Sequence, residues 1–108
     1  MGLKQKLEKD LREALRDRDE RRKATLRLAL AAIKNAEISK GKELDESEVI
    51  GVLSKEAKLY RESAEQFAKG AREDLVAREE QDLSILIEYL PAQLSQEEIE
   101  ARAREVIE

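Results

Sequence analysis

The feature that most constrains this chain is the regular spacing of its apolar residues. Near the N-terminus, leucines stand at positions 3, 7, 11 and 15. Such a four-residue spacing places them along one face of a helix. From residue 46 onward, apolar residues again advance by threes and fours through Val49, Leu53 and Ala57. With only one Pro and four Gly to interrupt it, the pattern predicts an all-α protein, a bundle of about four helices.

Helix start and stop signals set the boundaries. Asp19 and the pair Asp45/Glu48 have the form of N-terminal caps, whereas Gly41 and Pro91 are typical stops. They predict helices over residues 3–16, 20–38, 46–69 and 72–90, with a fifth helix opening at residue 95 after the Pro-containing turn. We expect residues 1–90 to form one helical domain. Residues 91–108 would then be the turn and first helix of a second, truncated domain.

The composition excludes most catalytic chemistry. The chain has neither His nor Cys, which removes the commonest general base and the usual zinc ligands. Acidic clusters such as Glu79, Glu80 and Asp82 are interpreted as solvated faces. No catalytic residue, metal site or cofactor is therefore predicted, and autonomous catalysis is not expected. Since no apolar run approaches ~20 residues and no signal peptide is apparent, a soluble, cytoplasmic protein without membrane contact is expected.

Charge is unevenly distributed along the chain. Residues 1–36 hold 11 basic against 6 acidic residues, whereas residues 70–108 hold 4 basic against 11 acidic. A basic front is compatible with a nucleic-acid surface. The interpretation that we favour from composition alone is that the two halves attract each other on folding.

The segment from Thr25 to Ile38 contains basic residues to which both interpretations apply. On a helical wheel its apolar surface wraps beyond one stripe, because Leu28 lies away from the side that holds Leu26 and Ile33. A helix of this kind is usually central in its bundle. Its polar sector continues a basic row that is either a set of snorkelling side chains or a phosphate-binding surface. The candidate nucleic-acid-binding residues are Arg18, Arg21, Arg22, Lys23, Arg27 and Lys34.

One glycine interrupts the predicted helix 46–69. Gly51 costs about 1 kcal/mol relative to Ala inside a helix. We interpret it as a site of close helix approach in preference to a functional site.

Four segments together resemble the GatB/YqeY-like family. They are TLRLALAAIKNAEI, VLSKEAKLYRESAEQF, AREDLV and EYLPAQLSQEEIE, in that order and spacing. The residues that match the family's motifs, besides Arg27 and Lys34, are Asn35, Glu37, Lys55, Lys58, Arg61, Glu62, Ser63, Phe67, Arg72, Asp74, Leu75, Tyr89 and Pro91. Three features depart from the family's pattern: Leu59-Tyr60 replaces more polar residues, Ala71 stands where Gly often occurs, and the chain stops at Glu108.

The resemblance implies a small, all-α bacterial protein related to the tail of the B subunit of the tRNA-dependent amidotransferase, a tail that contacts tRNA. The family accordingly carries the label of a carbon–nitrogen ligase with glutamine as amido donor, although the amidation chemistry belongs to other domains of that enzyme. Two functions remain open. The chain is an accessory module of tRNA amidation that contacts tRNA, or a helical protein-interaction or self-association module with no RNA role.

Overall fold

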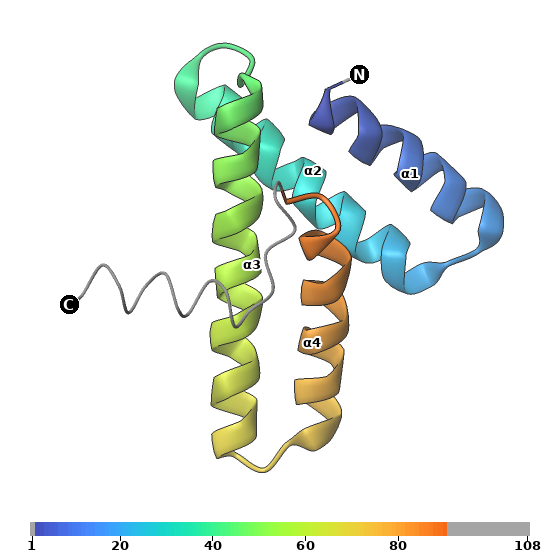
Figure 1. Cartoon of the computed structure of the whole chain (residues 1–108), viewed down its shortest axis with the longest axis vertical. Helices are drawn as coiled ribbons and strands as arrows, with labels where there is room; N and C mark the ends of the chain where they lie inside the picture. The colour runs from blue at the N-terminus through green and yellow to red at the C-terminus, as the bar shows by residue number, and fades with distance from the viewer. Residues whose placement is uncertain (1, 91–108) are drawn as a thin grey trace.

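The computed structural model describes residues 2–90, which form four helices and no strand. They are α1 (Leu3–Asp17), α2 (Glu20–Lys40), α3 (Glu46–Lys69) and α4 (Glu73–Ile87). Figure 1 shows α3 and α4 side by side as an antiparallel hairpin. Helix α2 crosses this hairpin obliquely and carries α1 along its length. The all-α prediction is confirmed, and each of the four expected helices is present within this part of the chain.

The predicted signals define three of the helix starts and stops. Asp19 accepts a hydrogen bond from the Arg22 backbone N–H. Asp45 and Glu48 form a complete capping box at the start of α3. Gly41 ends α2 with φ of 85°, in the left-handed region that glycine adopts without strain. Ala71 also has a positive φ, 59°, where the side chain makes that geometry unfavourable.

The end of α4 differs from the prediction. The helix stops at Ile87 rather than continuing to Leu90. The amides of Tyr89 and Leu90 donate to the carbonyls of Leu86 and Ile87 instead. These three-residue bonds tighten the chain into a turn ahead of Pro91. The predicted fifth helix, and the second domain to which it was assigned, lie outside the described residues.

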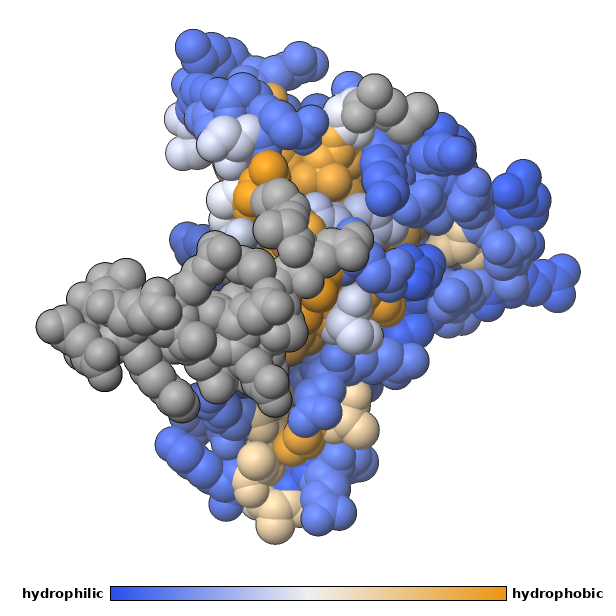
Figure 2. All heavy atoms as spheres, in the orientation of Figure 1, coloured by the Kyte–Doolittle hydropathy of each residue, from blue (hydrophilic) through white to orange (hydrophobic). Residues whose placement is uncertain are grey.

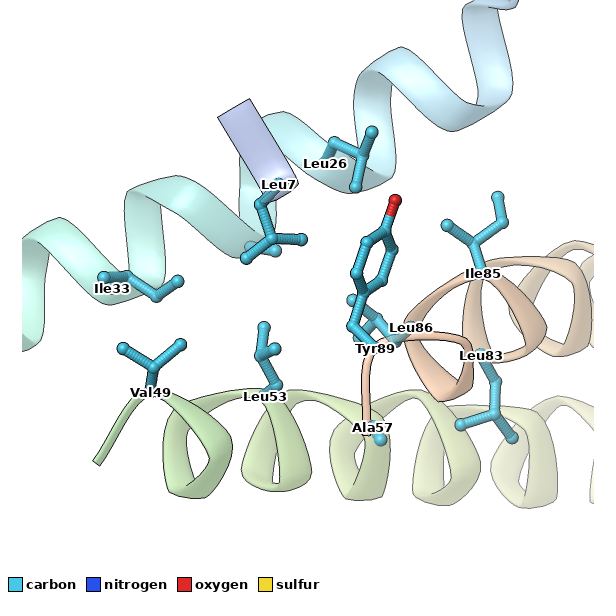
Figure 3. Packing of buried hydrophobic residues seen from close by; sticks show 11 residues of the cluster. Leu7, Leu26, Ile33, Val49, Leu53, Ala57, Leu83, Ile85, Leu86 and Tyr89 are labelled. Atoms are coloured by element: carbon cyan, nitrogen blue, oxygen red, sulfur yellow. The ribbon is translucent and has the colours of Figure 1, made fainter. Parts of the chain in front are cut away.

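All four helices contribute to an aliphatic core. Figure 3 shows Leu7 of α1 and Leu26 of α2 pointing toward Leu53 of α3, with Leu86 of α4 completing the cluster. The Tyr89 ring inserts between Leu26 and Leu86 from the turn that follows α4. Hydrophilic residues cover most of the surface around the apolar centre in Figure 2. Burial of this cluster, at about 25 cal/mol per Å² of apolar surface, is the main force that holds the helices together.

Two expectations about packing are wrong. Leu15, predicted to extend the apolar stripe of α1, is 44% exposed, although its neighbour Ala14 is buried. Residues spaced by four turn about 40° further around a helix at each step, so the stripe leaves the side that holds Leu7 and Ala14. Gly51 does not mark a close helix approach, since a Cβ built on it would meet nothing within 4 Å. It lies instead on an open groove between α2 and α3, beside Ala36, Leu44 and Val52.

A candidate binding face on helix α2

Helix α2 is the shared element of the bundle, because it packs against each of the other three described helices. Its inner side supplies buried Leu26, Ala29 and Ile33. The prediction of a central position is confirmed in that sense. However, the second apolar side of α2, marked by Leu28, is open to solvent. The basic residues of α2 consequently fall into two groups with different surroundings.

Arg21 belongs to the inner group. Its guanidinium forms an ion pair with the Asp82 carboxylate of α4, with Nε 2.9 Å from Oδ1 and an NH2 hydrogen bond of 3.1 Å to Oδ2. The same carboxylate accepts a 3.0 Å hydrogen bond from the Thr25 hydroxyl, whose side chain is buried. Asp82 therefore joins two polar side chains of α2 to α4. The interpretation of Asp82 as part of a solvated face is wrong.

Arg22 and Lys23 are also engaged by carboxylates. Arg22 donates to Glu88 at 2.9 Å across to the end of α4, and this bond raises the pKa of its guanidinium. Lys23 lies 2.7 Å from Glu20 on its own helix. The pairs of Arg21 and Arg22 connect the basic front of the sequence with its acidic back. Attraction between the two halves therefore accounts for part of the charge asymmetry.

The outer group lies about one to three turns further along α2. Arg27 and Lys34 are exposed and form no ion pair with any residue in the range 2–90. Leu28, which lies between them in the sequence, is 57% exposed, and Ile38, which follows Lys34, is 69% exposed. Asn35 is exposed in the same region. We call this surface the outer face of α2; it comprises Arg27, Leu28, Ala31, Lys34, Asn35 and Ile38.

Arg18 is separate from both groups. It caps the end of α1 in the left-handed conformation, with φ of 58°, and its side chain is exposed. The six candidate nucleic-acid-binding residues thus divide into three that are paired with carboxylates and three that face solvent. Their binding to RNA remains a prediction.

The motif residues of α3 are spread around that helix rather than gathered into one site. Lys55, Lys58 and Glu62 are exposed, whereas Arg61 and Ser63 are half-buried. Arg61 lines an open groove between α3 and α4, and its buried Nε has no hydrogen-bond partner within the described residues. Arg72 precedes α4 and lies 3.5 Å from Asp74. These positions do not form a catalytic constellation.

Glu37 connects the C-terminal end of α2 to neighbouring elements. Its carboxylate accepts two bonds from Lys4 Nζ, at 3.0 and 3.1 Å, and a third from the Leu44 backbone N–H at 3.2 Å. The Lys4 bond, followed by the Leu44 bond, holds the pKa of Glu37 below its usual range, and the pKa of Lys4 is raised in return. This motif residue therefore joins α1, α2 and the loop before α3.

Tyr89 has a comparable structural role. Its hydroxyl donates a 2.6 Å hydrogen bond to Asp10 of α1, and Lys6 Nζ lies 5.4 Å from the centre of its ring. Burial, assisted by the Asp10 carboxylate, raises the pKa of the phenol. Sequence reasoning matched Tyr89 to the family motif without finding this partner. No local signal exists for it, because the two residues are 79 positions apart.

Two further features, a metal site and a membrane-spanning helix, were looked for in the described residues. Residues 2–90 contain no group of three or more potential metal-ligating side chains. None of the helices they form is long and apolar enough to cross a membrane.

Known proteins are similar to this sequence over most of its length. The chain is 41% identical over 105 residues to altered inheritance of mitochondria protein 41, mitochondrial, of Lachancea thermotolerans, covering 94% of this chain and 56% of the relative. The corresponding protein of Kluyveromyces lactis is 40% identical with the same coverage. That of a Saccharomyces cerevisiae strain is 38% identical over 78% of this chain and 46% of its own length. The chain thus spans about half the length of the curated relatives it matches.

These relatives correct two expectations. They are yeast proteins whose names place them in mitochondria, so the predictions of a bacterial source and a cytoplasmic location are wrong. Of the resemblance to the GatB/YqeY-like family, the YqeY-like part is confirmed. The model of the YqeY-like protein family matches residues 4–108, and the chain therefore belongs to that family.

Proposed function

We propose that this chain is a non-catalytic accessory module of tRNA-dependent amidation that works by binding a protein of that machinery through the outer face of α2. The link to amidation rests on the similarity of YqeY-like sequences to the tail of the amidotransferase B subunit. The observation that carries the binding role is the exposure of Leu28 and Ile38, at 57% and 69%. Large apolar side chains grouped on one exposed helix face commonly mark a contact surface.

The non-catalytic part of the proposal is supported by the residue inventory. The chain has no His or Cys to act as general base or nucleophile. The polar side chains with the most developed hydrogen-bond networks, Asp82 and Glu37, hold the helices together. The oxygens of both carboxylates are engaged in contacts between helices, which is a structural role.

Direct contact with tRNA is a second candidate, favoured by the exposure of Arg27 and Lys34. Three further candidate cations, Arg21, Arg22 and Lys23, already have carboxylate partners. Each neutralised phosphate contributes to salt-dependent affinity, so fewer free cations predict weaker binding. The exposed leucine and isoleucine beside Arg27 and Lys34 gain nothing from a phosphate backbone. A protein surface fits the outer face better.

Amidation of Glu-tRNA(Gln) by a complete amidotransferase tests the proposal. Addition of the purified chain should raise the yield or rate, whereas the chain with glutamine and no amidotransferase should give no product. The Leu28→Ser/Ile38→Ser variant should lose the effect. A chain that amidates tRNA by itself, or one that leaves the amidotransferase unaffected, contradicts the proposal.

A further inference from the structure

The exposed residues of α2 form a heptad seam. Leu28, Ala31, Asn35 and Ile38 follow one another at intervals of three, four and three residues. This spacing is the one that aligns side chains along a helix for contact with a second helix. Because all four positions are exposed, the seam is unpartnered within the described bundle. A helix is therefore the element of secondary structure that matches it.

Charge defines one edge of the seam. Arg27 and Lys34 are separated by seven residues, which is one heptad, and so lie on the same side of the apolar row. Neither is neutralised by a carboxylate in residues 2–90. In paired helices, positions that flank the apolar seam select partners by charge. A helix that places acidic residues one heptad apart along its edge would complement them.

The same charges argue against a second copy of the chain. If two α2 helices paired antiparallel through this seam, Arg27 of one copy would face Lys34 of the other. Like charges at that position oppose association. In a parallel pair the facing edge would hold Ala32 and Ser39, which supply no carboxylate. Self-association thus leaves both cations without a partner.

Asn35 adds a restriction on register. Its side-chain amide forms no hydrogen bond with another described residue, and it stands within the seam between Ala31 and Ile38. A single polar residue at a seam position favours one alignment of the two helices, at some cost in affinity. The partner would satisfy the Asn35 amide with a polar side chain at the same level.

We infer that the outer face of α2 binds an amphipathic helix of another protein, one with an apolar stripe flanked by acidic residues one heptad apart. This inference rests on the proposed function, and it specifies the chemistry of the partner. Leu28, Ala31 and Ile38 would pack against the stripe. Arg27 and Lys34 would pair with its acidic edge.

A charge-reversal experiment with designed peptides tests this. The full chain is titrated with a helical peptide of three heptads that carries leucines on its seam and glutamates on its flanks, and with the same peptide carrying lysines in place of the glutamates. The chain should bind the glutamate peptide roughly ten-fold more tightly. Arg27→Glu/Lys34→Glu should reverse this preference, and Leu28→Ser/Ile38→Ser should weaken binding of both peptides.

The matched control is Lys9→Glu/Arg16→Glu. These residues are also exposed and one heptad apart, but they lie on α1, and their reversal should leave the order of affinities intact. The inference is overturned if this control shifts the preference as much as the α2 reversal does. It is also overturned if the chain does not discriminate between the peptides, binds bulk tRNA in preference to the glutamate peptide, or dimerises through α2 in sedimentation. Discrimination between the peptides without an effect on amidation would leave the inference standing while refuting the proposed function.

Discussion

The inner and outer basic residues of α2 differ in what surrounds them, although they belong to the same helix. Arg21 reaches Asp82, and Arg22 reaches Glu88, so both join α2 to α4. Arg27 and Lys34 reach solvent beside exposed Leu28 and Ile38. The fold thus divides one row of basic residues into two groups. The inner group joins helices, and the outer group is free to bind a partner. Removing the contacts of the inner group should therefore lower the unfolding free energy more than removing the outer group does.

The largest effect should come from Asp82→Ala. This change leaves the Arg21 guanidinium and the buried Thr25 hydroxyl without their shared partner. Loss of a partly buried charged partner of this kind costs about 2–3 kcal/mol of unfolding free energy. Urea unfolding measures it, with Glu80→Ala, an exposed change on the same helix, as the control. A loss below about 0.5 kcal/mol would mean that the inner group is not structural.

A smaller effect is expected for Arg22→Ala. Its pair with Glu88 is partly exposed, with side chains 30% and 53% accessible, and pairs of this kind contribute at most about 1 kcal/mol. Thermal unfolding at low and high salt measures it, since screening weakens an exposed pair. The difference from wild type should shrink as salt increases. An undiminished difference would assign the effect to packing of the arginine stem instead.

Glu37 predicts a pH dependence for the opposite end of α2. Because its pKa is lower in the folded chain than the ordinary value of 4.5, it stabilises the fold above that value and loses this contribution as the pH falls through the folded pKa. Between about pH 6 and about pH 3, Glu37→Gln should therefore lose less stability than wild type. The unfolding free energy at each pH measures this. If the variant and wild type lose the same unfolding free energy, Glu37 does not contribute to the destabilisation by acid.

Arg27→Ala/Lys34→Ala should have the smallest effect on stability. Both side chains are exposed and unpaired within residues 2–90, so the unfolding free energy should stay within about 0.5 kcal/mol of wild type. Urea unfolding beside Asp82→Ala provides the comparison. Destabilisation as large as that of Asp82→Ala would erase the distinction between the two groups.

Local signals in the sequence predicted where the helices begin and end. They did not predict which residues surround an individual side chain. The cap at Asp19 and the capping box at Asp45 are encoded within four residues, and α3 begins and ends where the sequence predicts. The partners of Arg21 and Arg22 lie 61 and 66 positions away, beyond the reach of any periodic pattern. The apolar wheel of α2 also overstated burial at Leu28, because periodicity identifies an apolar face without indicating whether another element covers it.

Mapping of the binding surface tests most directly whether the outer face of α2 binds a partner helix. Backbone amide shifts of the isotopically labelled full chain can be followed during titration with the glutamate-flanked peptide. We expect shifts along the outer face of α2, centred on Leu28, Asn35 and Ile38, with little change at Asp82. Shifts centred on Lys55 and Lys58 of α3, or no shifts at all, would contradict it.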